Sequence, residues 1–312
     1  MINFKYHVVS LTAVFLALAI GLIVGTAALN GPLSDELKHQ VTQLSAQNQQ
    51  YRSQVNSLKT EVNQKEQFVT QIAPLVLPGK LAGRHVLVVS TQQSDADVKS
   101  VDSDLQLAGA TITGHVTIED NFVKPDNNGP LLDLAATTLT TLNTNAITGL
   151  PANSDGVETS TGLLAAALMN HVPAVPRQSQ QEILAAYKSA GYIDYDTVPT
   201  GPAEAVIVLA GLPYTDQDAT KENQNTLTMV TGFDKAGPIV LAASSTAGSG
   251  NVVSAVRGDA SLSKTVSTVD NDNTLQGVLA VTLALNEQVV FGRTGHYGLG
   301  SNASASLPKP QS

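Results

Sequence analysis

Cysteine and tryptophan are absent from this chain of 312 residues, and charged and aromatic side chains are scarce. Without cysteine, no disulfide bond can stabilise the fold, and no thiolate can bind a metal ion. Charged residues make up only 14% of the chain, and the formal net charge is −9. Because an acidic chain is repelled by phosphate groups, we expect neither nucleic acid nor an anionic lipid surface as a partner.

The motifs of common catalytic sites are also absent. The sequence contains neither the G-x-S-x-G of a serine hydrolase nor the H-E-x-x-H of a zinc protease. The acidic run Asp270–Asn273 fails as an EF-hand loop, because its twelfth position would be Val281, and it better suits a cap for a helix at Thr274. The histidines occur singly, at His7, His39, His85, His115, His171 and His296. We therefore predict that the chain is not an enzyme and has no resident metal or cofactor.

A long apolar run begins near the amino terminus. Residues 8–29 contain no Asp, Glu, Lys, Arg or His. As a helix this run would extend about 33 Å, enough for a hydrocarbon core of about 30 Å. The alternative is a cleaved signal peptide, whose apolar core would be shorter, about 7–15 residues, and followed by a small-residue cleavage site. The length favours a transmembrane helix over residues 8–29.

The charges that flank this run predict its orientation. Lys5 and the amino terminus precede it, whereas Asp35, Glu36 and Lys38 follow it. A short positive amino end stays in the cytoplasm. We therefore expect residues 1–7 in the cytoplasm and the bulk of the chain outside the cell membrane.

Small residues recur at intervals of four within the apolar run. Ala17, Gly21 and Gly25 would lie on one face of the helix, where a second helix backbone can approach closely. Glycine and alanine are also common in membrane helices without such a role. We predict a membrane-helix interface at these three positions because the next segment indicates pairing independently.

Residues 33–73, called the rod below, follow a heptad pattern. The a positions are Val41, Asn48, Val55, Val62 and Val69, and the d positions are Leu37, Leu44, Tyr51, Leu58, Lys65 and Ile72. Nine of these eleven positions are apolar, whereas heptad positions b, c and f are mostly polar. This narrow apolar face is typical of a coiled coil rather than of a surface helix. We expect all of these positions except Lys65 to form the interface. Pro74 and Pro78 predict the end of the helix.

The pattern also predicts how the rod pairs. Valine at a with leucine at d favours two parallel strands, and Asn48 would fix their register. In a parallel homodimer Glu61 would face Glu66 of the other chain, and Lys65 would weaken the same end. A heterodimer with a different membrane protein would relieve both, so a homodimer and a hetero-coiled coil remain alternatives.

Short apolar runs alternate with helical segments over residues 80–292. The predicted strands are Arg84–Ser90, Thr111–Ile118, Ala205–Ala210, Pro238–Ala243 and Lys264–Val269. The predicted helices are Asp95–Ala108, Pro130–Leu142, Val157–His171, Gln178–Ala190, Thr220–Lys235 and Thr274–Phe291. This alternation predicts an extracytoplasmic α/β domain with a doubly wound, mostly parallel sheet, flavodoxin- or Rossmann-like, in strand order 2-1-3-4-5. Residues 293–312, rich in Gly, Ser, Ala and Pro, are expected to form a flexible tail.

One loop of this domain is a candidate ligand site. Residues 244–251 (SSTAGSGN) follow a predicted strand, and Ser244, Ser245, Gly248 and Gly250 could offer backbone N–H groups to an anion. The loop lacks the lysine of a P-loop and the spacing of G-x-G-x-x-G. A flexible turn without a ligand is the alternative.

Several strings place the chain beside a known family. Residues 2–7 (INFKYH) before the membrane helix, the strand RHVLVVS and residues 292–298 (GRTGHYG) resemble the actinobacterial MctB family over essentially the full chain. The resemblance implies a cell-envelope protein, described as a channel-forming component of copper efflux in the outer membrane. The same family is linked to daughter-cell separation, with a membrane partner and control of peptidoglycan hydrolysis.

The residues discriminate between these two roles. Copper(I) prefers thiolate and thioether ligands, but this chain offers only Met1, Met169 and Met229, which are not clustered. A channel needs several membrane helices or a closed barrel, whereas one apolar span is predicted. The leading hypothesis is therefore a dimerising, single-pass scaffold outside the membrane. Its action with a membrane partner in cell separation or in control of peptidoglycan hydrolysis is what the resemblance implies. The alternative is copper efflux or homeostasis, in which copper enters only through the family resemblance.

Overall fold

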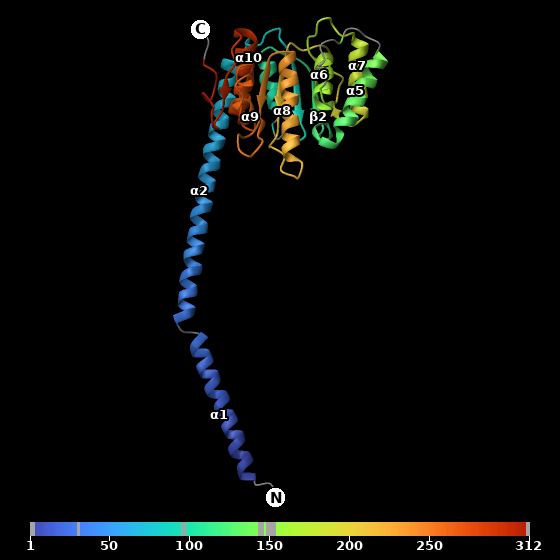
Figure 1. Cartoon of the computed structure of the whole chain (residues 1–312). Helices are drawn as coiled ribbons and strands as arrows, with labels where there is room; N and C mark the ends of the chain where they lie inside the picture. The colour runs from blue at the N-terminus through green and yellow to red at the C-terminus, as the bar shows by residue number, and fades with distance from the viewer. Residues whose placement is uncertain are drawn as a thin grey trace. The chain divides into compact units, whose positions relative to one another are not determined.

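The computed structural model describes residues 4–29, 32–94, 96, 98–142, 147 and 154–309. The chain divides into two compact units, Met1–Lys65 and Glu66–Ser312. The first unit comprises helix α1 (Phe4–Leu29) and most of helix α2 (Pro32–Val76), and the second comprises the end of α2 and the α/β domain (Figure 1). Residues 95 and 97 of the predicted helix Asp95–Ala108, and residues 310–312, lie outside the described part of the chain.

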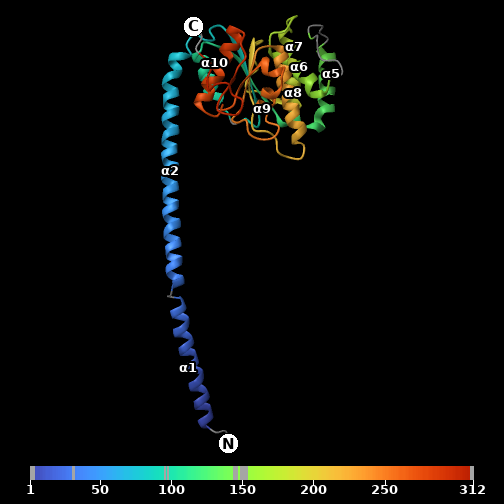
Figure 2. The same ribbon diagram turned by 60° about the vertical axis from the view of Figure 1, so that its left-hand side comes forward.

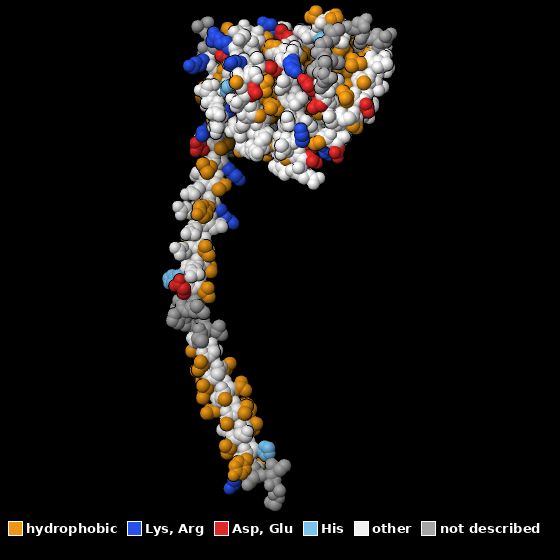
Figure 3. Space-filling model, in the orientation of Figure 1, with side chains coloured by type: hydrophobic (Ala, Val, Ile, Leu, Met, Phe, Trp, Pro, Cys, Tyr) orange, Lys and Arg blue, Asp and Glu red, His pale blue; other side chains and the backbone are white. Residues whose placement is uncertain are grey.

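Helix α1 is long and apolar enough to cross a membrane. Within Phe4–Ala27, a window of 18 residues has a mean hydropathy of 2.6, and none of that window is buried. Its two threonine hydroxyls are satisfied inside the helix, since Thr12 Oγ1 donates to the carbonyl of Val8 at 2.6 Å and Thr26 Oγ1 to that of Leu22 at 2.9 Å. This arrangement suits lipid, where no water is present to bond polar groups. Figure 3 shows apolar side chains along the helix.

Helix α2 runs for 45 residues and passes through Pro74, so the predicted end before this proline is wrong. Proline removes one backbone donor but does not prevent a helix whose remaining groups are well packed. Here the N–H of Leu77 donates to the carbonyl of Ala73 at 3.0 Å, and both side chains are buried in the α/β domain. Burial of this last turn offsets the lost hydrogen bond.

The described part of the α/β domain contains a seven-stranded sheet in the order β3-β2-β1-β4-β5-β6-β7. The strands are β1 (His85–Thr91), β2 (Thr111–Ile118), β3 (Ile193–Asp194), β4 (Ala205–Leu209), β5 (Ile239–Ala242), β6 (Val266–Val269) and β7 (His296–Tyr297). All neighbours are parallel except β2 and β3. Counted along the chain, the five longer strands stand in the order 2-1-3-4-5, as the sequence predicts. The short strands β3 and β7, which were not predicted, form the two edges.

Helices cover both faces of the sheet. They are α3 (Val98–Leu107), α4 (Asp120–Val123), α5 (Asn128–Leu142), α6 (Gly156–Leu168), α7 (Arg177–Ser189), α8 (Ala219–Ala236), α9 (Val252–Gly258) and α10 (Leu275–Phe291), with short 3₁₀ turns η1 (Pro125–Asn127) and η2 (Leu262–Lys264). One core packs α3, α10 and the end of α2 on the sheet, and the other packs α4 to α9 on the opposite face. The central strands are therefore apolar throughout, as in β4, where every residue is buried. Figure 2 shows the domain from a second side.

The end of α2 belongs to the core of the domain. Val69, Ala73 and Leu77 pack with α3 and α10, and a carboxylate oxygen of Glu66 accepts a hydrogen bond from the N–H of Leu275 at 3.1 Å. That N–H opens α10, where the helix dipole favours a negative charge. Val69, which the heptads assign to the coiled-coil interface, thus contacts the chain's own domain.

The expected flexible tail is wrong for residues 293–309. His296 and Tyr297 form β7 beside β6, and the carbonyl of Ala305 accepts a hydrogen bond from the N–H of Gly298 at 3.0 Å. A Cβ on Gly298, whose φ is +124°, would overlap the carboxyl group of Asp270. The Gly- and Ser-rich composition predicted a flexible tail, but the same residues also permit the tight turns of an ordered segment.

A buried ion pair holds this carboxyl-terminal segment. Arg257 on α9 lies 2.7 Å from Asp270 at the end of β6, and both side chains are 1% exposed. The Arg257 guanidinium also donates to the carbonyl of Tyr297 at 2.7 Å. Asp270 accepts from the N–H groups of Leu299 at 2.7 Å and Gly300 at 2.9 Å. These bonds satisfy both charges and connect α9, β6 and the segment after β7.

Asp270→Asn should destabilise residues 66–312 by about 3–5 kcal/mol, because it leaves the Arg257 charge buried without its partner. Chemical denaturation measures the loss. The matched control is Lys235→Gln, which removes a more exposed ion pair with Glu158 at 3.1 Å and should cost less than about 1 kcal/mol. Equal effects of the two substitutions would show that the Arg257–Asp270 pair does not hold the segment.

Candidate functional site

The predicted ligand loop, residues 244–251, is tied by its own hydrogen bonds. Asn251 Nδ2 donates to the carbonyls of Ser245 at 2.9 Å and Ala247 at 3.3 Å, while its Oδ1 caps α9 by accepting from the N–H of Ser254 at 3.1 Å. Gly250, at φ +82°, leaves no space for a Cβ because Asn223 lies against it. The geometry of this loop is explained without a ligand, so binding at Ser244, Ser245, Gly248 and Gly250 stays a prediction without structural support.

The crevice beyond β1 and β4, where a doubly wound sheet usually binds its ligand, is filled. A Cβ on Gly211, which follows β4, would overlap the backbone carbonyl of Gln93, which follows β1. The remaining cavity, bounded by Thr91, Pro213 and Tyr214 among others, holds about 10 Å³. That volume accommodates about one water molecule and no cofactor.

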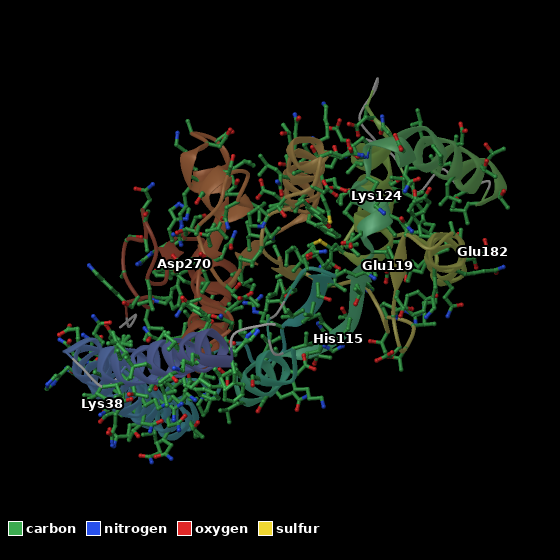
Figure 4. The ribbon with its side chains drawn as sticks, turned by 90° about the horizontal axis from the view of Figure 1, so that it is seen from below. Lys38, His115, Glu119, Lys124, Glu182 and Asp270 are labelled. Carbon is green, nitrogen blue, oxygen red and sulfur yellow. The ribbon has the colours of Figure 1, made fainter. Side chains whose placement is uncertain are left out.

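Polar side chains close the same edge of the sheet. Tyr214 Oη donates to Asp120 Oδ1 at 2.8 Å, and Gln93 Nε2 donates to Asp120 Oδ2 at 3.2 Å. Gln92 Nε2 donates to Glu119. Burial raises the pKa of Tyr214, so its hydroxyl stays protonated and can donate. Figure 4 shows Glu119 and Lys124 at the two ends of α4, well apart from Asp270. These pairs join the loops after β1, β2 and β4.

Glu222, in the first turn of α8, is a buried acid that the sequence analysis did not single out. Its side chain is 2% exposed, and its Oε2 atom has no hydrogen-bond partner among the described residues. Burial, followed by the nearby carboxyl of Asp216 and the charge of Asp218, raises the pKa of Glu222 to about 7, against a smaller lowering effect of Lys124. Acidic residues at a helix start normally suggest an exposed cap, so no local signal indicated this burial.

The donor groups that copper prefers are not gathered in the described residues. No cluster of three or more His, Cys, Asp or Glu side chains there could hold a metal ion. Met169 and Met229 are buried in the core between the sheet and α4 to α9. His115 lies 2.8 Å from Asp102, and His296 is hydrogen-bonded to Thr268 at 2.9 Å and to the Ser263 carbonyl at 3.1 Å. Among the described residues, therefore, no gathered set of side chains matches the ligands that copper prefers.

The predicted interface residues of the rod carry the exposed apolar surface. From Leu37 to Val62 the apolar a and d side chains are 48–66% exposed. On α1, a Cβ added to Gly21 or Gly25 would meet nothing within 4 Å, so a second backbone can approach there. Contiguous apolar surface of this kind marks a site of interaction with a protein or a membrane.

Comparison with known proteins extends over all of these segments. A family model described as "Copper transport outer membrane protein, MctB" matches residues 1–308. The chain belongs to the MctB family. Curated MctB proteins named "Copper transporter MctB" include one from Mycobacterium leprae, 30% identical over 324 residues that cover 100% of both chains. Another, from Mycobacterium tuberculosis, is 27% identical over 310 residues, or 97% of this chain and 98% of the relative. The resemblance found in the sequence is thereby confirmed.

For this MctB-family chain, the folded state should lose stability as the pH rises. Folded Glu222 keeps its proton up to about pH 7, whereas the unfolded chain releases it near the ordinary value of 4.5. The folded state therefore binds more protons between these values, and its unfolding free energy falls as the pH rises through them. Glu222→Gln should flatten this dependence and raise stability at pH 8 by about 1–3 kcal/mol.

Denaturation of residues 66–312 at pH 5 and pH 8 tests this expectation. Glu182→Gln is the matched control, because Glu182 is exposed on α7. A Glu222→Gln protein with the pH dependence of the unmodified chain would contradict the buried, protonated carboxyl.

Proposed function

We propose that this chain is a membrane-anchored, non-enzymatic subunit of copper transport in the cell envelope. The observation that carries the proposal is the MctB match, which includes α1, the rod and the α/β domain together. Copper is the transported substrate in the family's description, and the relatives' names say the same. These names favour copper transport over the cell-separation scaffold that the sequence analysis placed first.

The positions of the possible copper ligands favour a subunit that works within a larger assembly. Copper(I) binds soft sulfur ligands best, and the described methionines are enclosed in the core. The crevice of the sheet is filled as well. The chain therefore serves transport through what it binds on its surface, and a partner supplies the path and the ligands for copper.

Pairing through α1 and the rod follows from the exposed surfaces. The apolar a and d side chains between Leu37 and Val62 lie in water in a single chain. Fully burying a Val or Leu side chain contributes about 1.5–3 kcal/mol, so a second helix on this face is strongly favoured. We propose a parallel coiled coil, as a homodimer or with another membrane protein, with Asn48 setting the register.

The anchor and the domain have defined places in this proposal. α1 spans the cell membrane with the amino terminus in the cytoplasm, and the α/β domain lies outside; the outer membrane named by the family is the alternative location. The strand order of the domain supports a flavodoxin-like fold, here without a cofactor crevice.

A scaffold in cell separation remains the second candidate. The observation that favours it is the absence of a fitting copper site in the described residues. Both candidates use the same anchor and paired rod, so they differ in the partner and in the phenotype.

Deletion of the gene should raise cell-associated copper severalfold after a copper challenge, because the transport assembly loses its anchored subunit. Elemental analysis of washed cells measures this. The full chain should restore the normal level, whereas a chain with Val55→Pro, which breaks the rod helix, should not. Normal copper together with unseparated daughter cells would favour the second candidate instead.

Single cysteines at Val55 or Val62 should cross-link between chains in membranes, since both are a positions. The sequence has no native cysteine, so each variant carries one thiol. Ser53→Cys, at the outward f position, is the control and should remain monomeric on a non-reducing gel. The absence of any cross-link at Val55 and Val62, to a copy or to another protein, would remove the paired rod.

A further inference from the structure

Beyond Lys65, α2 carries a second apolar surface that differs from the heptad interface. Phe68 is 63% exposed and Leu75 is 77% exposed, and Ile72 is partly exposed between them. The spacing i, i+4, i+7 puts these three side chains on one face of the helix. We call them the α2 stripe.

A groove lies beside the α2 stripe. Its apolar walls are Ile72, Leu75 and Val76 of α2, Leu279 and Leu283 of α10, and Leu307 of the carboxyl-terminal segment. Polar side chains, Asn286 and Glu287 among them, also line it. The cavity volume is about 640 Å³, which is large enough to receive several apolar side chains. The stripe and the groove thus place protruding and recessed apolar surface next to each other.

The apolar exposed face changes its heptad positions at Lys65. Val69 and Val76 are a positions, but both pack against the core of their own domain. Phe68 and Leu75 each precede one of them and occupy g positions, while Ile72 is a d position. The exposed apolar surface of α2 therefore uses a and d up to Val62 and then d and g.

The polar residues near Lys65 permit this change in the exposed face of α2. Lys65 pairs with Glu61 of the same helix at 2.9 Å. Glu66, expected to face Glu61 of another chain, is directed at the N–H of Leu275 in its own domain. The repulsion between Glu61 and Glu66 that the heptads predict across a parallel pair is thereby reduced.

We propose that the α2 stripe and its groove are a docking surface for a second copy of this chain, which extends the paired rod onto the α/β domains. The inference rests on the pairing in the proposed function. Two copies anchored in one membrane run parallel and in register, so identical residues meet at the same height. A self-complementary patch with its own protrusion and recess is what a two-fold interface requires.

The length of the rod supports this occupant over an unrelated one. Up to Val62 the heptads supply seven apolar positions and one asparagine. Such a short coiled coil with a buried polar pair is of limited stability, because Asn at a lowers it. Burial of the α2 stripe against a second copy adds apolar contact in the same helix, immediately after the point where the heptad interface ends.

Cysteine cross-linking of the full chain in membranes tests the proposal. The variants are Phe68→Cys and Leu75→Cys on the stripe, with Val55→Cys as the rod reference. The matched control is Gln67→Cys, which is exposed on a different side of α2. We expect symmetric cross-links at Val55, Phe68 and Leu75, and at most a small fraction of that yield at Gln67.

The other possible results distinguish failure of the docking surface from failure of the paired rod. A cross-link at Val55 without one at Phe68 or Leu75 overturns the docking surface and leaves the paired rod standing. The same holds if Leu75→Cys reacts with a different protein, or if Gln67→Cys reacts equally well. No symmetric cross-link at Val55 overturns this inference; if Val55→Cys also gives no cross-link to another protein, the proposed pairing falls with it.

A second measurement does not depend on thiol geometry. The double variant Phe68→Ser, Leu75→Ser should raise the dimer dissociation constant of the detergent-solubilised full chain at least tenfold in analytical ultracentrifugation. Both side chains are exposed in one chain, so its thermal unfolding should change little, and Gln67→Ser should leave association unchanged. An unaltered dissociation constant in the double variant overturns the proposal.

Discussion

The packing of the last turns of α2 into the core of the α/β domain determines which apolar side chains of this segment stay exposed. Val69, Ala73 and Leu77 are held in the core with α3 and α10, and Glu66 caps the start of α10. The face of this segment that packs on the domain cannot contact a partner as well, so Phe68 and Leu75 are the large apolar side chains left exposed on it.

The α/β domain is closed where related architectures bind ligands. The backbone of Gln93 lies so close to Gly211 that no side chain would fit there. Asn251 holds the glycine-rich loop after β5 by hydrogen bonds. The buried Arg257–Asp270 pair uses its charges to hold the carboxyl-terminal segment. These polar and charged side chains thus hold segments of the fold together, while exposed apolar side chains lie along α1 and α2.

The proposed role in copper transport is one in which the chain acts together with partners. A protein that held copper itself would bring sulfur or imidazole groups together. Here the described methionines, Met169 and Met229, are buried in the core. His115 pairs with Asp102 and His296 is hydrogen-bonded to Thr268, and the histidines lie far apart in the sequence. The proposed anchored subunit, paired along α1 and α2, would reconcile the family's description with the residues present.

Periodicity in the sequence determined much of this structure. The uncharged run predicted α1, and the apolar runs predicted β1, β2, β4, β5 and β6 in their order, because buried parallel strands need side chains that are apolar on both faces. Local patterns could not show that Pro74 stays inside a helix, that residues 293–309 pack as β7, or that Glu222 is buried, since each depends on segments distant in the sequence. The heptads determined that α2 has an apolar face. Only the tertiary structure decided that Val69 and Val76 face the domain and that Phe68 and Leu75 remain exposed, because the same helix face cannot contact two partners at once.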